Sequence, residues 1–426
     1  MTDPESPDTN PLALAARALE SGRLDEADGF FEQACAGSNP AEGFNGRGMT
    51  AAMRGDFSSA SQHFQRAIDL EPANAVFRFQ FGVSMLGQGR LEPATTAFEK
   101  AVELDAGFGQ AWFNLGAARR QAGDGDGAIE AFRRSSEGDR GVPQGRLAIV
   151  ETLRAGGAVE PAIAAAREAI AEKDDWAEAW GQLGLCLAAK QDIETALTCW
   201  ERAVELEPKF LDARFHIGVA HGMLGRLDEA AAAYRTVLES APGHVKSAVN
   251  LAGLLMHKGE LDEAERRLVD ATRVQSPERA MALTALGDLR MRQIKLAEAE
   301  QSFREACSLV PREPRPCIGL IACLLEQEKH GDALAEAERL SREHPDLPAS
   351  AECLVEALIA NGHAEQAMGV IDPCIARHGA TPLRHGLKGR VCETMGDRDG
   401  ALAAFEAALA LDPNFTPAQQ GKARLA

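Results

Sequence analysis

The chain has 426 residues, of which 45% are hydrophobic and 26% charged, so its composition is that of a folded protein rather than a disordered one. Its 45 basic and 64 acidic residues give a net charge of −19, which disfavours partners such as nucleic acid and anionic membrane surfaces. No apolar run approaches the roughly 18 residues of a membrane span, and residues 1–10 lack the features of a signal peptide. We therefore expect a cytoplasmic protein that binds no nucleic acid and does not insert into membranes.

The sequence repeats with a period of 33 to 35 residues, and one alanine marks the register in every unit. A period of this length predicts a solenoid built from stacked units rather than one large globular core. The alanines are Ala27, Ala60, Ala94, Ala128, Ala162, Ala196, Ala230, Ala264, Ala299, Ala333, Ala367 and Ala401.

In chain order, we expect a disordered N-terminus over residues 1–7, a repeat array over 8–415 and a polar C-terminal capping helix over 416–426. The array divides into twelve predicted repeats of nearly equal length. They are 8–40, 41–74, 75–108, 109–142, 143–176, 177–210, 211–244, 245–278, 280–313, 314–347, 348–381 and 382–415.

Residues 177–210 show how one unit is built. Trp180, Leu183 and Leu187 recur at helical spacing and predict a first helix, A. Ala196 and Trp200 lie on one face of a second predicted helix, B. A position between the two helices is often glycine, which predicts a left-handed residue there. Those glycines are Gly55, Gly89, Gly123, Gly225, Gly259, Gly362 and Gly396.

These features match the signature W-x2-L-G-x2-Y, A-x3-F and P of the tetratricopeptide repeat. Trp112, Leu115 and Gly116 fit its first helix, and Ala128 and Phe132 fit its second. The chain therefore resembles the tetratricopeptide repeat family, and its Ala- and Arg-rich, Lys-poor composition suggests a bacterial source. The resemblance implies an all-α solenoid of about twelve helix-turn-helix units, a right-handed superhelix whose A helices line a concave groove.

The resemblance also implies which positions of each repeat face the groove. The fifth position supplies an apolar stripe from five repeats in the first half of the groove, and the twelfth supplies methionines in two repeats. Such side chains either hold the apolar anchors of a bound peptide or helix, or pack between neighbouring A helices. These candidates are Phe79, Phe113, Leu147, Phe215, Val249, Met256 and Met291.

The sixth position supplies polar candidates for gripping a peptide backbone. In O-GlcNAc transferases this position carries a ladder of asparagines, and here the ladder is broken. Lysine is missing from the fifth position, so the carboxylate clamp of chaperone adaptors is absent as well. The polar candidates are Gln80, Asn114, Gln182, His216 and Asn250.

We find no motif for catalysis, for a cofactor or for a metal. The nine cysteines include no Cys-x-x-Cys pair and are scattered like small apolar residues, which indicates a reduced protein. The sequence therefore predicts a non-catalytic scaffold that binds peptide or helical segments of partner proteins in its groove. An alternative is an accessory substrate-recognition subunit of a glycosyl- or sulfotransferase-type enzyme. Self-association into a homo-oligomer is a further expectation.

Overall fold

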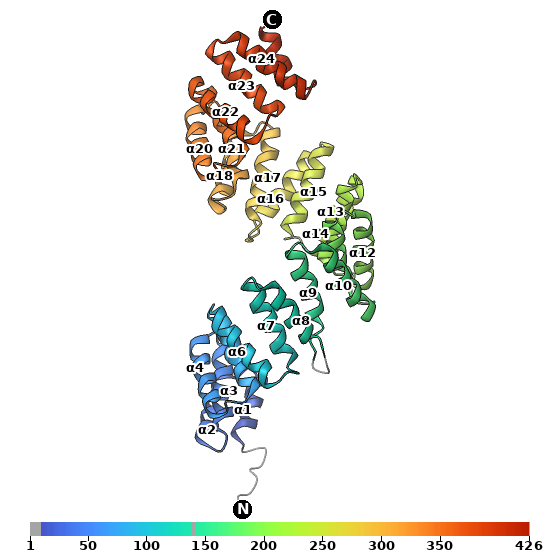
Figure 1. Cartoon of the computed structure of the whole chain (residues 1–426), viewed down its shortest axis with the longest axis vertical. Coiled ribbons are helices and arrows are strands. Elements are labelled where there is room, and N and C mark those ends of the chain that lie inside the picture. The colour runs from blue at the N-terminus through green and yellow to red at the C-terminus, as the bar shows by residue number, and fades with distance from the viewer. Residues whose placement is uncertain (1–9, 138–140, 426) are drawn as a thin grey trace, which may run out of the picture. The chain divides into compact units, whose positions relative to one another are not determined.

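The computed structural model describes residues 10–137 and 141–425, and this part of the chain forms 25 α-helices and no strand (Figure 1). The all-α fold predicted from the sequence is confirmed. The predicted N-terminal segment 1–7 lies outside the described residues.

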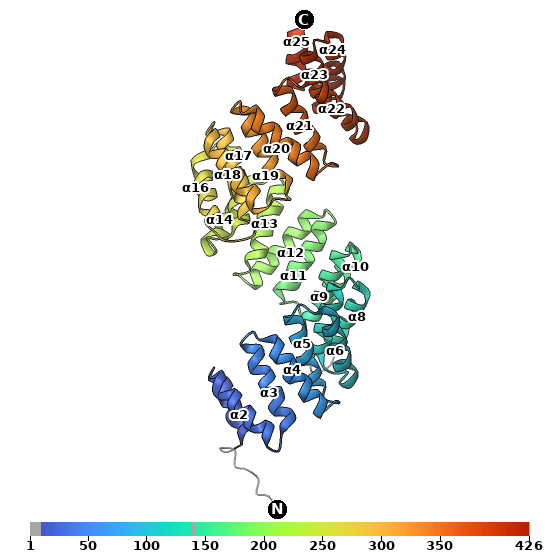
Figure 2. The ribbon, with the colours of Figure 1, turned by 90° about the vertical axis from the view of Figure 1, so that its left-hand side faces the viewer.

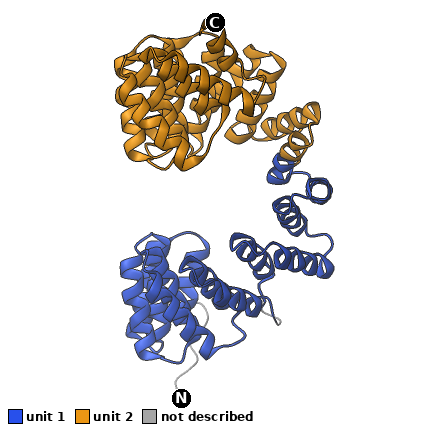
Figure 3. Cartoon of the chain, turned by 45° about the horizontal axis from the view of Figure 1, so that its top comes forward, with its two compact units in different colours: residues 1–216 blue, residues 217–426 orange. Residues whose placement is uncertain are grey.

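The chain divides into two compact units, residues 1–216 and 217–426, with the boundary inside helix α13 (Leu211–Met223) (Figure 3). The other helices of the first unit are α1 (Pro11–Glu20), α2 (Leu24–Ala36), α3 (Pro40–Met53), α4 (Phe57–Leu70), α5 (Ala75–Gly87), α6 (Leu91–Leu104), α7 (Gly109–Gln121), α8 (Gly125–Ser135), α9 (Gln144–Ala155), α10 (Val159–Glu172), α11 (Ala177–Ala189) and α12 (Ile193–Leu206). Those of the second unit are α14 (Leu227–Ser240), α15 (Val245–Lys258), α16 (Leu261–Thr272), α17 (Arg279–Arg292), α18 (Leu296–Leu309), α19 (Pro314–Glu326), α20 (His330–Glu343), α21 (Pro348–Ala360), α22 (Ala364–His378), α23 (Pro382–Met395), α24 (Arg398–Leu411) and α25 (Thr416–Leu425).

The helices pack in chain order. From α1 to α12, and again from α14 to α25, each helix contacts the next one. In the second unit, odd-numbered helices from α15 onward also contact one another in succession, so that α17, α19, α21 and α23 lie side by side (Figure 2). This arrangement of consecutive packed pairs is that of a solenoid of two-helix repeats.

Small residues allow the two helices of a pair to approach closely. All twelve alanines of the repeat register are 0% exposed. In seven of the pairs, a glycine of the first helix also faces an aromatic ring of the second. At Gly184, for example, a Cβ would lie 2.5 Å from Nε1 of Trp200, which instead donates a hydrogen bond to the carbonyl of Gly181 at 3.1 Å. A larger residue in these positions has no room.

The turn between the two helices of a pair is built the same way twelve times. One residue there has a positive φ, and the N–H of the following residue donates to the carbonyl five residues before it, as Asp56 does to Ala51 at 3.0 Å. This is the Schellman motif, which ends a helix with its last carbonyls satisfied. The positive-φ residues are Gly22, Gly55, Gly89, Gly123, Gly157, Gln191, Gly225, Gly259, Ile294, Glu328, Gly362 and Gly396.

The seven glycines expected to be left-handed are all among them, but three turns use a residue with a side chain. Gln191, Ile294 and Glu328 have φ values of 69°, 59° and 59°. The left-handed region costs such residues about 1–2 kcal/mol relative to glycine. The packing of the helix pair therefore imposes this backbone even where the sequence does not favour it.

Candidate functional site

In the first unit the predicted apolar groove residues also pack on the rings behind them. Phe79 is half-buried, and its ring centroid lies 5.9 Å from that of Phe98 and 5.0 Å from that of Phe108. Phe113 is half-buried with its centroid 5.4 Å from that of Phe132. These two predicted contact residues therefore support the helix pairs as well as presenting part of their surface.

The other predicted residues of this unit are half-buried too. Gln182 on α11 donates to a carboxylate oxygen of Glu151 on α9 at 3.3 Å, and the ring of His216 stacks 5.1 Å from that of Trp200. Phe215 lies edge-on to His216 at 5.3 Å. Within α7, Gln110 donates a hydrogen bond to Asn114. Gln80 lies on α5 and Leu147 on α9.

In the second unit, the structure separates the predicted residues into two groups. Val249 and Met256 on α15 line a cavity. Asn250 instead donates a hydrogen bond to the Tyr234 hydroxyl at 3.1 Å, and Met291 packs against the apolar core between α17 and α20. Sequence position alone could not distinguish the two groups.

The cavity has a volume of about 660 Å³ and lies over α17. One face of this helix forms its floor through Met281, Thr284, Ala285 and Asp288, which have the i, i+3, i+4, i+7 spacing of a helix face. Because α15, α17 and α19 pack side by side, their neighbouring faces supply a continuous surface.

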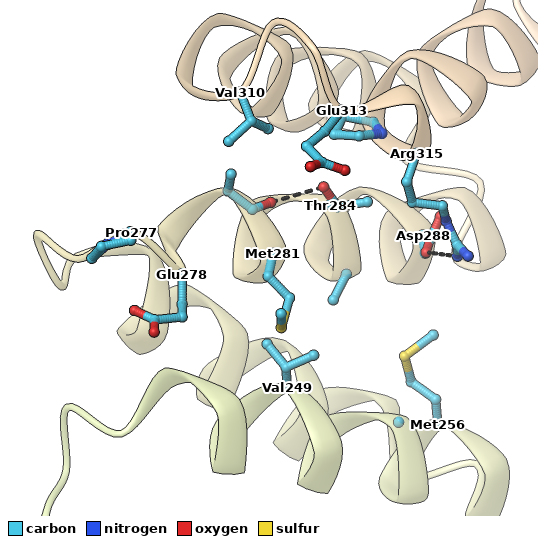
Figure 4. Close-up of a pocket in the computed structure, with 14 residues that line it drawn as sticks. Val249, Met256, Pro277, Glu278, Met281, Thr284, Asp288, Val310, Glu313 and Arg315 are labelled. Atoms are coloured by element: carbon cyan, nitrogen blue, oxygen red, sulfur yellow. Dashed lines mark hydrogen bonds and ion pairs between the residues drawn. The ribbon is translucent and has the colours of Figure 1, made fainter. Parts of the chain in front are cut away.

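Figure 4 shows the two walls of this cavity, which we call the α17 groove. Met281 points from α17 toward Val249 on α15, and Met256 reaches toward α17 from the same wall. On the other side, Val310 and Glu313 of the α18–α19 turn project toward α17. The Met281 side chain is 47% exposed although it is apolar. The α17 groove thus presents two flexible thioether side chains and two valines at its surface.

The rim of the α17 groove is charged and mainly acidic. Three carboxylates, Glu278, Asp288 and Glu313, line it with the single cation Arg315. The guanidinium of Arg315 pairs with Asp288 at 3.0 Å. Glu278 lies 3.6 Å from the ammonium of Lys246, which is 51% exposed, and the pKa of Glu278 is lowered chiefly by a backbone hydrogen bond. The site therefore combines apolar walls with a net negative rim.

Three residues of the α17 groove were not predicted from the sequence: Met281, Val310 and Glu313. Met281 occupies the second position of its repeat, and no apolar column marks that position. Val310 and Glu313 belong to the turn between two repeats, which contributes to the cavity only because α19 packs beside α17.

Among the described residues, no group of three His, Cys, Asp or Glu side chains is placed to hold a metal ion. Within the same ranges no helix has both the length and the apolar character needed to cross a bilayer.

Family models describing the tetratricopeptide repeat match residues 79–143, 187–245, 223–286 and 385–415. Each region contains helices of the packed pairs described above.

Two known proteins are similar in sequence to parts of this chain. The type IV pilus assembly protein PilF of Pseudomonas aeruginosa is 24% identical over 159 residues, which cover 37% of this chain and 63% of that protein. Subunit 3 of the anaphase-promoting complex of Schizosaccharomyces pombe is 23% identical over 181 residues, covering 42% of this chain and 27% of that protein. The chain thus spans less than two thirds of either relative.

Among solved structures, a tetratricopeptide repeat protein from Parabacteroides merdae is similar with a TM-score of 0.47 and 19% identity, over 58% of this chain and 98% of that one. The regions that the models match are thus similar to tetratricopeptide repeats, and the same packing of consecutive helices is found on either side of them.

Proposed function

We propose that the protein is a non-catalytic scaffold that binds a segment of a partner protein in the α17 groove. The observation that carries the proposal is Met281, a large apolar side chain that is 47% exposed on the floor of a cavity of about 660 Å³. Exposed apolar side chains gathered in a concave site are typical of surfaces that bind other proteins.

The chemistry of the α17 groove indicates what kind of segment it accepts. An apolar side chain of the partner fits between Met256 and Met281, because thioethers adapt to the shape of an inserted group. The three rim carboxylates outnumber Arg315 and the neighbouring Lys246, and this net negative charge favours a Lys or Arg beside that anchor. We therefore propose a segment with a large apolar anchor and an adjacent basic residue as the ligand.

The predicted residues of the first unit are proposed as an additional contact surface. Phe79 and Phe113 retain exposed parts, although both rings also pack on buried rings. Substitution of these phenylalanines would disturb folding as well as binding. The α17 groove is the better place to test the proposal, because Met281 can be changed without removing a buried side chain.

The test is a selection of short peptides from a random display library on the immobilised full-length protein. We expect the enriched peptides to share one large apolar residue with a neighbouring Lys or Arg. They should bind Met281→Gln at least several-fold more weakly than the wild type. They should bind Met395→Gln as well as the wild type, because Met395 is equally exposed, 47%, but lies on α23 outside the α17 groove. Enriched peptides without a shared anchor, or with unchanged binding to Met281→Gln, would refute the proposal.

A further inference from the structure

Two cysteine thiols from successive predicted repeats meet at the two ends of the segment that forms one wall of the α17 groove. Cys307 lies in the last turn of α18 and Cys317 in the first turn of α19, and their Sγ atoms are 3.3 Å apart. Both are free thiols; Cys317 is buried, with 1% exposed, whereas Cys307 is half-buried. Nine residues of turn and helix separate them in sequence, so the contact depends on how α18 and α19 pack.

A guanidinium is held against the buried thiol. Arg339 on α20 places Nη2 3.3 Å from Sγ of Cys317. The same guanidinium donates to Glu336 at 2.7 Å and to Glu343 at 3.1 Å, so its orientation is fixed by two carboxylates. Three helices thus bring two sulfurs and one permanent positive charge together.

We infer that Cys307 and Cys317 form a reversible intramolecular disulfide when the protein meets a hydroperoxide, so that the α18–α19 junction is a redox-sensitive site. This inference is independent of the proposed partner binding. Disulfides in reduced compartments are generally transient and serve redox sensing or catalysis.

The geometry requires only a small movement. A disulfide has an S–S length of about 2.05 Å, so the two sulfurs must approach by about 1.2 Å from their present contact. Rotation of the two side chains can supply much of this approach. Cys307, which is half-buried and keeps part of its surface exposed, also gives a reductant access to the bond once it has formed.

The oxidation balances in two steps. The Cys317 thiolate attacks one oxygen of the hydroperoxide, the O–O bond breaks, and a sulfenic acid forms with release of hydroxide or alkoxide. The Cys307 sulfur then attacks the sulfenic sulfur, the S–O bond breaks, and the thiol proton leaves with the oxygen as water. The two sulfurs lose two electrons in total, and the hydroperoxide gains them.

The surroundings favour these roles for the two thiols. The hydrogen bond with Cys307 lowers the pKa of the Cys317 thiol to about 6, and the Arg339 guanidinium acts in the same direction against the opposing effect of burial. The same hydrogen bond, together with burial, raises the pKa of Cys307. Because the Arg339 guanidinium lies 3.3 Å from Sγ of Cys317, we assign the thiolate to Cys317 and the role of the thiol that resolves the sulfenic acid to Cys307.

The bond would join the two ends of the segment that forms one wall of the α17 groove. Val310 and Glu313 lie between the two cysteines, and Arg315 and Pro316 precede Cys317 directly. Oxidation would therefore restrain this wall relative to the reduced protein.

The test treats the full-length protein with hydrogen peroxide and examines it by mass spectrometry under non-reducing conditions. We expect the loss of two hydrogen masses, reversed by dithiothreitol, and a linked pair of tryptic peptides, 305–312 and 313–329. Because the second peptide also contains Cys323, fragmentation and the variant Cys323→Ala decide which sulfur is bridged. Cys323 is buried in the same helix, so Cys323→Ala is the matched control and should keep the disulfide.

Two variants test the order of the steps. In Cys307→Ala, oxidation should stop at a sulfenic acid on Cys317. Dimedone labels this sulfenic acid, so the measurement does not depend on formation of the disulfide. Arg339→Gln should slow oxidation at pH 7 by about tenfold, because the thiolate loses its cation. The inference is overturned if no linked peptide forms, if Cys323→Ala abolishes the link, or if Cys317→Ala retains it. Dimedone labelling elsewhere than Cys317 in the Cys307→Ala variant, or an unchanged rate for Arg339→Gln, overturns the assignment of Cys317 as the attacking sulfur.

Discussion

The contact between a glycine of one helix and an aromatic ring of the next can be tested at Gly82. A Cβ added there would lie 2.6 Å, 2.8 Å and 3.0 Å from three ring atoms of Phe98, which is 0% exposed. Carbon atoms in contact are normally about 3.5–4.0 Å apart, so the ring must move by about 1 Å. Overpacking of this kind costs about 1–3 kcal/mol, whereas alanine stabilises a helix by about 1 kcal/mol relative to glycine. We expect Gly82→Ala to lower the free energy of unfolding by about 1 kcal/mol.

The matched control is Gly29→Ala on α2, in the same unit. A Cβ at Gly29 meets nothing within 4 Å, so only the helix propensity acts, and stability should rise by up to about 1 kcal/mol. Urea unfolding followed by circular dichroism measures both variants. The double variant Gly82→Ala/Phe98→Leu should lose less stability than the sum of its single variants, because the smaller side chain makes room for the methyl group. If Gly82→Ala stabilises the protein as Gly29→Ala does, the packing argument is refuted.

Two further predictions concern the turns and the ion pairs. Ile294 is 80% exposed with a φ of 59°, so Ile294→Gly should raise the free energy of unfolding by about 1 kcal/mol. Gly259 has a φ of 81°, so Gly259→Ala should lower the free energy of unfolding by a similar amount. Thermal unfolding measures both variants. The hydrogen bond from Lys295 to Glu265, 2.8 Å long, lowers the pKa of that carboxyl. A carboxyl whose pKa is lowered by folding stabilises the protein at pH values above its ordinary pKa of 4.5, and this stabilisation is lost as the pH falls through the lowered pKa. Glu265→Gln should therefore be less stable than the wild type at pH 7, and the difference should vanish in acid. Equal urea midpoints for Glu265→Gln and the wild type at pH 7 would contradict this.

The sequence predicted the helix pairs because small residues recur where the chain cannot accommodate large ones. Ala230, for example, belongs to the register, and the structure buries it completely. The left-handed turns were predictable where they are glycine, as at Gly259, but not at Ile294, because a β-branched residue disfavours this backbone and only the packing of its neighbours requires it.

The candidate site was less predictable because it depends on contacts between repeats. Val249 and Met256 could be named from their columns, but Met281 could not, since its importance comes from its exposure within a cavity. The same limit applies to Cys307 and Cys317, whose positions differ between successive repeats and whose sulfurs meet only when α18 packs on α19.

The measurement that tests the central proposal most directly is a calorimetric titration of one selected peptide into the wild type, Met281→Gln and Met395→Gln. We expect binding at least about tenfold weaker for Met281→Gln, a loss of about 1.4 kcal/mol, and unchanged binding for Met395→Gln. Replacing the apolar anchor of the peptide by alanine should have a similar effect in the wild type and little further effect in Met281→Gln. Unchanged affinity for Met281→Gln, or an equal loss in both variants, would contradict binding in the α17 groove.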